Sequence, residues 1–229
     1  MKRIIFYILF LTANLNLNAQ NEVLISFNSL INNDSLVLDK SFLLDDQKVQ
    51  VSKLKFYISN VAFFLKEKSV YSEKNSFHLI DFEKKKSLEI VFKSKRKFTF
   101  DKVSFVLGID SNTNHSGVKG GALDPTKGMY WAWQSGYINF KIEGQSESLN
   151  NNKHEFAFHL GGFLNGNNCA EKVQLFIEDN EKTININLNL SEFLKSINLK
   201  KDYKIMSPGE EAIYLSKEIS KRFTIIENE

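Results

Sequence analysis

Apolar and polar residues alternate along most of the chain with a period of two, the spacing of a strand that buries one face. The alternation is clearest at 137–142, 155–160 and 184–190, and phenylalanine, with 20 residues, fills many of the apolar positions. Similar signals predict further strands at 23–27, 49–65, 77–82, 88–92, 98–107 and 173–177. A shift of the pattern at Ser59 and Asn60 predicts a bulge or a turn inside 49–65. About nine or ten short strands predict an all-β fold, an antiparallel β-sandwich with a phenylalanine-rich core.

Two stretches have helical features instead. Residues 191–196 suit one or two helical turns after the last long strand. Near the C-terminus, Ser207 can cap a helix, Pro208 suits its first position, and Glu210 completes a capping box. Apolar residues then recur at helical spacing to about residue 222. The predicted fold class is therefore a β-sandwich with a short C-terminal α-helix.

The first 19 residues have the composition of a secretory signal peptide. Lys2 and Arg3 precede an unbroken apolar run over 4–11, and Ala19 ends a plausible cleavage site. The alternative is an N-terminal membrane anchor, but the run is too short to span a bilayer. We expect export to a periplasm or beyond, no membrane span after signal removal, and one domain over 20–229.

Charge and cysteine content exclude several classes of partner and linkage. Removing Lys2 and Arg3 with the signal lowers Lys plus Arg from 30 to 28, against 27 acidic residues. A chain so close to neutral has no electrostatic footprint for nucleic acid or a membrane surface. Cys169 is the only cysteine, so no internal disulfide can form. We expect a buried thiol there, with an intermolecular bridge or a metal ligand as alternatives.

The sequence carries none of the common enzyme motifs. It lacks Gly-x-Ser-x-Gly, a phosphate-binding glycine loop, His-Glu-x-x-His and Cys-x-x-Cys. The glycines of 117–121 have the wrong spacing and no strand-to-helix context, so they predict a loop. We therefore expect that the protein is not an enzyme.

Both tryptophans lie in the stretch 124–137, which is preceded by Gly120 and Gly121. On an extended backbone Trp131 and Trp133 point to the same face, because side chains alternate along a strand. Two indoles on one face indicate either the centre of a core or the wall of a site.

Histidine supplies the remaining chemistry, since neutral imidazole is the commonest metal ligand. His78 and His159 lie in predicted strands, His115 lies in the loop before the tryptophans, and His154 borders an asparagine-rich loop. The four are far apart in sequence, so a metal site has to be assembled from separate strands and loops. A hydrogen-bonded structural role is the alternative for each strand histidine.

Five blocks of the sequence carry a further signal: Lys55-Phe-Tyr-Ile-Ser-Asn-Val, His78-Leu-Ile-Asp-Phe, Leu107-Gly-Ile-Asp-Ser, Met129-Tyr-Trp-Ala-Trp-Gln-Ser-Gly-Tyr-Ile-Asn-Phe and Phe158-His-Leu-Gly-Gly. Together they resemble the MbnP-like domain family of exported proteins, from about residue 22 to the end of the chain. The resemblance implies a β-sandwich that binds copper. For some members of the family it also implies that a di-haem cytochrome peroxidase-like partner oxidises a tryptophan to kynurenine, which then joins histidines as a copper ligand.

The resemblance assigns roles to three residues, and closeness in sequence adds a fourth. His159 corresponds to the histidine of the Phe-His-Leu-Gly block and is the expected metal ligand. Trp131 and Trp133 correspond to the tryptophan pair, and His115 is the histidine nearest to them in sequence and the second expected ligand. We therefore expect an exported copper-binding protein acting in metal binding or acquisition. The alternative is a non-metal β-sandwich with a binding or structural role, in which the tryptophans form core or a ligand platform.

Overall fold

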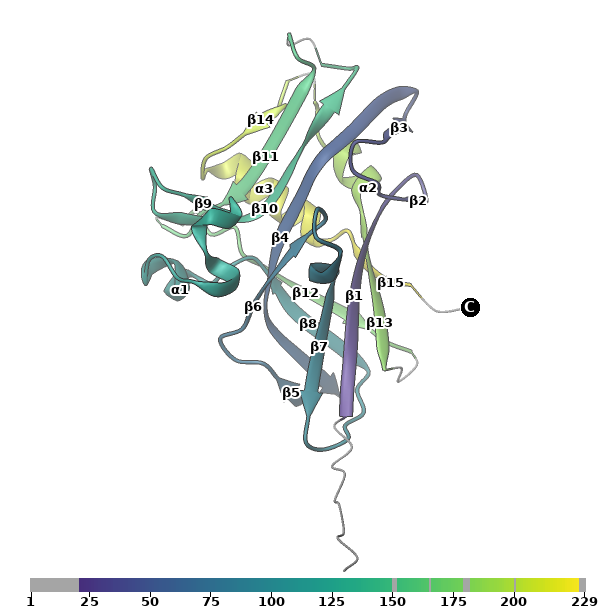
Figure 1. The fold of residues 1–229 in the computed structure, drawn as a ribbon, viewed down its shortest axis with the longest axis vertical. Coiled ribbons are helices and arrows are strands. Elements are labelled where there is room, and N and C mark those ends of the chain that lie inside the picture. The colour runs from purple at the N-terminus through teal and green to yellow at the C-terminus, as the bar shows by residue number, and fades with distance from the viewer. Residues whose placement is uncertain (1–20, 150–151, 165, 179–181, 200, 227–229) are drawn as a thin grey trace, which may run out of the picture.

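The computed structural model describes residues 21–149, 152–164, 166–178, 182–199 and 201–226 (Figure 1). The predicted signal peptide, 1–19, lies outside these residues. No helix within the described ranges is long and apolar enough to cross a membrane.

Strands make up most of the fold. Their bounds are β1 Asn21–Ile31, β2 Asp34–Ser35, β3 Ser41–Leu44, β4 Gln47–Leu65, β5 Lys68–Ser72, β6 Phe77–Asp81, β7 Glu89–Ser94, β8 Lys102–Leu107, β9 Tyr130–Trp131, β10 Gly136–Ser146, β11 Glu155–Gly161, β12 Glu171–Phe176, β13 Thr183–Asn189, β14 Lys204–Ile205 and β15 Phe223–Ile226. The α-helices are α1 Ser111–His115, α2 Leu190–Lys195 and α3 Glu210–Ser220, and 3₁₀ turns lie at Lys85–Leu88, Gly121–Leu123 and Pro125–Lys127.

Two sheets face each other across the core. The smaller sheet has the order β15-β13-β1-β2, with β7 also paired to β1. The larger has the order β12-β8-β4-β10-β11-β14, with β3, β5 and β6 paired to β4 and β9 paired to β10. The predicted β-sandwich with a short C-terminal helix is confirmed. Most pairs are antiparallel, but β1 pairs with β13 and β11 with β14 in parallel. Alternation in the sequence determines which face each residue takes and leaves strand direction open.

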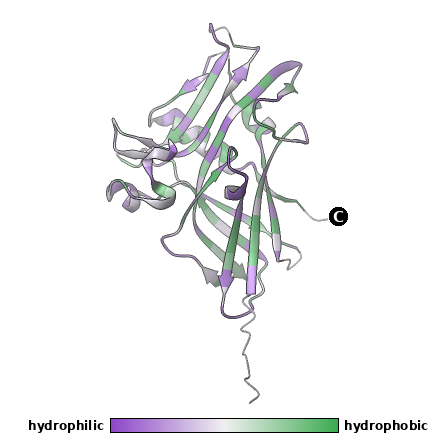
Figure 2. Ribbon diagram, in the orientation of Figure 1, coloured by the Kyte–Doolittle hydropathy of each residue, from purple (hydrophilic) through white to green (hydrophobic). Residues whose placement is uncertain are grey.

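Phenylalanine rings fill the space between the sheets, as the alternation predicts. Phe27 of the smaller sheet packs edge-on against Phe56 and Phe105 of the larger, with ring centroids 5.9 and 6.1 Å apart. Phe140 stacks on Phe56, which links β10 to the same cluster. Apolar and polar residues alternate along these strands in Figure 2. Such aromatic pairs add about 0.5–1.5 kcal/mol each beyond the area they bury.

The long strand β4 organises the larger sheet. Its pairing with β8 shifts register between Ser59 and Ala62, and Asn60 there has φ of 51°. The predicted irregularity at Ser59 and Asn60 is therefore a bulge inside one continuous strand. It bends β4 where the sheet curves, as bulges commonly do.

The C-terminal helix α3 begins later than the capping prediction requires. Its N-cap is Gly209, with no side-chain cap hydrogen bond, so the predicted capping box of Ser207 and Glu210 is wrong. Ser207 lies two residues before the cap and cannot reach the free N–H groups of the first turn. The apolar periodicity is confirmed, because Ala212, Leu215 and Ile219 are buried.

The connection from β8 to β10, residues 108–135, folds back over the outer face of the larger sheet. It carries α1, two 3₁₀ turns and β9 (Figure 1). β9 pairs with β10, α1 lies against β10, and the turn at Gly121–Leu123 lies against β6. We call this segment the excursion. Beneath it lies a second apolar cluster, separate from the core between the sheets and made of Tyr57, Ile109, Leu123, Met129, Trp131, Tyr137 and Ile138.

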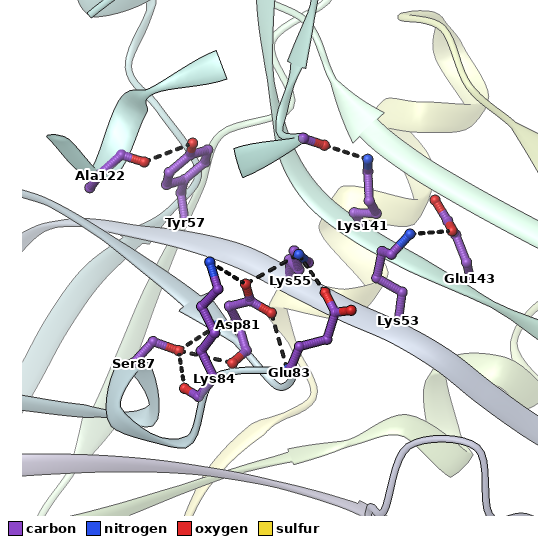
Figure 3. Close-up of polar contacts among 11 residues, drawn as sticks. Lys53, Lys55, Tyr57, Asp81, Glu83, Lys84, Ser87, Ala122, Lys141 and Glu143 are labelled. Atoms are coloured by element: carbon purple, nitrogen blue, oxygen red, sulfur yellow. Dashed lines mark hydrogen bonds and ion pairs between the residues drawn. The ribbon is translucent and has the colours of Figure 1, made fainter. Parts of the chain in front are cut away.

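Hydrogen bonds attach both ends of the excursion to the sheet. Gly108 N–H donates to the Tyr57 carbonyl at 2.8 Å, and Ile109 N–H donates to Asn139 Oδ1 at 3.0 Å. Asn114 of α1 then bridges back, since its Nδ2 donates to the Ile109 carbonyl and its Oδ1 accepts from Tyr137 N–H. Tyr57 Oη donates to the Ala122 carbonyl at 3.2 Å (Figure 3). The excursion is thus a fixed layer on the sheet.

We predict that Gly108→Ala loosens this layer. Gly108 has φ of +115°, and a Cβ there would lie 2.5 Å from Asn139 Cγ. The free energy of unfolding should fall by more than about 1 kcal/mol, measured by urea denaturation. Gly120→Ala is the matched control, because its Cβ would meet nothing within 4 Å and its φ is −91°. Equal stability of the two variants would contradict the prediction.

Candidate functional site

The two tryptophans lie at the end of the excursion in different environments. Trp131 ends β9 and is 6% exposed, whereas Trp133 lies in the following turn and is 67% exposed. Their ring centroids are still 6.0 Å apart. The expectation of an extended backbone through both was wrong, because the chain turns over 132–135 to enter β10. The pair therefore joins the second apolar cluster to the surface.

Glycines allow the indole to approach the sheet. A Cβ on Gly161, the last residue of β11, would lie 3.0 Å from Trp131 Cζ3. A Cβ on Gly136 would lie 3.2 Å from Phe163 Cε1. Because Gly136 is the cross-strand partner of Trp131, Phe163 and Trp131 both border the start of β10. Trp131 covers the end of β11 only because position 161 has no side chain.

His115 reaches the same region from the end of α1. Its ring packs edge-on against Phe163 with centroids 4.8 Å apart, and its Nδ1 hydrogen bonds to the Ser111 carbonyl at 2.7 Å. This contact leaves Nε2 as the nitrogen available to a ligand. The sequence placed His115 in a loop, and the structure places it at the C-terminal end of a short helix.

His159 occupies the outer face of β11, two residues before Gly161. It is 6% exposed, and its Nε2 lies 2.7 Å from Glu143 Oε1 on β10. The other carboxylate oxygen accepts from Lys53 Nζ at 3.0 Å. Residues two apart in a strand share a face and lie about 6.6 Å apart. His159 and the Gly161 position covered by Trp131 are therefore neighbours on one face.

A row of buried polar residues crosses this face, and sequence reasoning missed it. Asp81 pairs with Lys55, Lys55 with Lys141, and Lys141 with His159, across four adjacent strands. All four side chains belong to residues no more than 9% exposed. Each is a polar position in an alternating strand, so the sequence indicated its face. The registers that bring the four together depend on long-range pairing and carried no local signal.

The surroundings of the two lysines in this row shift their pKa values in opposite directions. Burial lowers the pKa of Lys55, but hydrogen bonds to Glu83 and Asp81 outweigh it, so the pKa is raised overall. Lys55 Nζ lies 3.1 Å from Asp81 Oδ2 (Figure 3). Burial lowers the pKa of Lys141, whose ammonium donates to the Gly128 carbonyl at the base of the excursion. Lys141 therefore helps to hold the excursion.

The structure connects the predicted residues through short local contacts. Trp131 contacts Trp133 and covers Gly161, and His115 packs on Phe163, which borders Gly136, the cross-strand partner of Trp131. His159 lies two residues before Gly161 in β11, with its Nε2 bound to Glu143. Nowhere in the described ranges do three His, Cys, Asp or Glu side chains group so that they could hold a metal ion. The candidate metal-binding side chains are therefore the two imidazoles, with the indole pair near them in the fold.

The remaining histidines and the cysteine have other partners. Cys169 is buried as expected, its Sγ donates to the Gly161 carbonyl, and burial raises the pKa of its thiol to about 11. His78 of β6 hydrogen bonds to Glu73 through Nε2 at 2.7 Å. His154 Nδ1 hydrogen bonds to the Leu149 carbonyl. A protonated, buried thiol is a poor metal ligand, since the thiolate is the binding form.

Comparison with known proteins identifies relatives of this fold. A sequence model of the MbnP family matches residues 20–207. Among solved structures, the chain is similar to MbnP from Methylosinus trichosporium, with a TM-score of 0.60 and 14% sequence identity, over 83% of this chain and 82% of that one. At this identity the structural likeness shows the fold alone. No curated protein matches at a significant level.

We predict that the two tryptophans differ sharply in their contribution to stability. Trp131→Ala removes a buried ring from the second apolar cluster and should lower the free energy of unfolding by about 3–5 kcal/mol. Trp133→Ala, at an exposed turn, is the matched control and should change it by no more than about 0.5 kcal/mol. Urea denaturation monitored by circular dichroism measures both, and similar losses would contradict the assigned burial.

We also predict an acid-dependent contribution from Glu143. The hydrogen bond from His159, helped by Lys53, lowers the pKa of Glu143 from 4.5 to about 2. A carboxyl whose pKa is depressed in the folded state stabilises the protein above its unfolded pKa, and this contribution is lost as pH falls toward the folded value. The Tm difference between wild type and Glu143→Gln should therefore shrink from about pH 5 to about pH 2. A difference independent of pH would refute the assigned pKa.

Proposed function

Because the chain belongs to the MbnP family, we propose that it is an exported protein that binds copper and acts in metal binding or acquisition. The family model begins at residue 20, directly after the predicted signal peptide. The observation that carries the proposal is the placement of Trp131 over Gly161, on the face of β11 that also presents His159.

His159 and His115 would hold the copper ion. Imidazole nitrogens suit copper in both common oxidation states. Each ring already has one nitrogen in a hydrogen bond, to Glu143 and to the Ser111 carbonyl, and each offers its other nitrogen. Two imidazoles are few for a protein copper site, so a third donor is needed. Copper would supply redox chemistry when bound, and these residues would hold the ion in place.

The third donor in this proposal is an aromatic amine formed by oxidation of a tryptophan to kynurenine. Trp131 is the better placed of the two, because its ring lies on the face that carries His159. Trp133 is exposed at 6.0 Å from Trp131, which gives an oxidising partner an aromatic contact at the surface. The partner is a di-haem cytochrome peroxidase-like protein, which would take electrons from the indole and pass them to a peroxide. Water would supply the oxygen atoms of the opened ring, and hydrolysis would release the lost carbon as formate.

The test is copper retention by the full chain purified from its own host. Wild type should retain copper, His159→Ala should lose it, and His115→Ala should lower it. His78→Ala is the matched control, because His78 is also a strand histidine bound to a carboxylate at 2.7 Å. Metal content is measured by plasma mass spectrometry. Retention of copper by His159→Ala at the wild-type ratio would contradict the proposal.

Peptide mass spectrometry tests the modification separately. The peptide that holds both tryptophans should gain one oxygen and lose one carbon, as tryptophan does on conversion to kynurenine. Host cells without the di-haem partner should yield the unmodified peptide.

A second function, a non-metal binding or structural sandwich, is favoured by the absence of a three-donor group among the described residues. It requires a metal-free protein whose Tm does not change under a chelator.

A further inference from the structure

The hydrogen bond from His159 to Glu143 points toward one end of β11, the end that carries Ala157. Glu143 is the cross-strand partner of Ala157, which lies on one side of His159, while Trp131 covers Gly161 on the other. His159 Nε2 lies 2.7 Å from Glu143 Oε1. The imidazole ring is therefore turned so that its Nε2 edge faces the Ala157 side of the strand.

The contact with Glu143 leaves the other ring nitrogen, Nδ1, without this carboxylate. Nδ1 and Nε2 are both bonded to Cε1 and point in divergent directions, so a ring whose Nε2 is held by Glu143 on the Ala157 side has Nδ1 turned away from that carboxylate. A carboxylate can only accept hydrogen bonds, so the proton of the neutral ring is on Nε2. Nδ1 consequently carries the free lone pair, which is the form in which a histidine nitrogen binds a metal ion.

Glu143 is itself held in place by neighbouring strands. Lys53, its cross-strand partner on β4, donates to Oε2 at 3.0 Å (Figure 3). Lys141, the cross-strand partner of His159, directs its ammonium to the Gly128 carbonyl. Glu143 Oε1 therefore accepts from His159, and the chain Lys53–Glu143–His159 fixes the imidazole from two adjacent strands.

We propose that Glu143 is a positioning residue that holds His159 in the Nε2–H tautomer, so that Nδ1 is the copper-binding nitrogen and faces Trp131. This inference rests on the proposed copper function and names the atom through which His159 performs it. A carboxylate bound to the outer nitrogen of a ligating histidine fixes the ring's tautomer and orientation and raises its basicity. The copper-binding nitrogen of His159 would then face the tryptophan side of β11.

The first test needs no copper. Two-bond nitrogen–hydrogen NMR correlations on the metal-free, ¹⁵N-labelled chain distinguish the tautomers of His159. Wild type should show the proton on Nε2, and Glu143→Gln should show a mixture or the Nδ1–H form. Glu143→Asp, which keeps the carboxylate, should restore part of the Nε2–H signal. Glu147→Gln is the control, because Glu147 pairs with Lys48 on the surface. An Nδ1–H signal in wild type would overturn the inference.

The second test is copper affinity, measured by competition with a chelator of known strength. Glu143→Gln should weaken binding by about 10–100-fold, and Glu147→Gln should not change it. Equal affinity of Glu143→Gln and wild type would overturn the role of Glu143 while the copper function stands. A wild type that carries the Nε2–H tautomer but binds no copper would instead overturn the proposed function, and this inference with it.

Discussion

The anchoring of the excursion to the sheet is the constraint on which the candidate site depends. Gly108 turns the chain at φ of +115° directly above Asn139, and Asn139 Oδ1 accepts the first free N–H of the excursion, that of Ile109. Asn114 makes a second link of this kind, because its Nδ2 donates to the Ile109 carbonyl and its Oδ1 accepts from Tyr137 N–H. These side-chain amides replace the ladder hydrogen bonds that the chain gives up on leaving β8. Together with the pairing of β9 with β10, they fix Trp131 and His115 relative to β11.

Much of the sandwich was accessible from sequence, because alternation reports burial directly. The segments around β4, β10 and β11 each have one apolar face, and those faces meet in the phenylalanine core. Short strands such as β9 and β14 escaped prediction, since two residues carry no periodicity. Their existence depends on partners distant in sequence, which is also why the parallel pairing of β11 with β14 had no local signal.

The site was predictable in its residue types and much less in its geometry. His159 stood on the polar face of its strand in sequence, and the structure keeps it there. Its partner Glu143 is 16 residues away and meets it only through the β10–β11 register. The turn after Trp131 was missed because tryptophan, alanine and glutamine do not mark turns; Ser135, with φ of 55°, completes it. Pairing and turn geometry, rather than composition, decide which nitrogen faces which ring.

The separation of two apolar clusters has a consequence for chemistry at Trp131. The ring belongs to the small cluster under the excursion, whereas the phenylalanines that hold the sheets together belong to the other. A change of Trp131 into a more polar side chain therefore reduces packing under one connection and leaves the contacts between Phe27, Phe56 and Phe105 intact. Local packing energies at separate sites add nearly independently when they share no contacts. A scaffold arranged in this way can hold a tryptophan that is chemically altered after folding, because the altered ring lies outside the core that determines the fold.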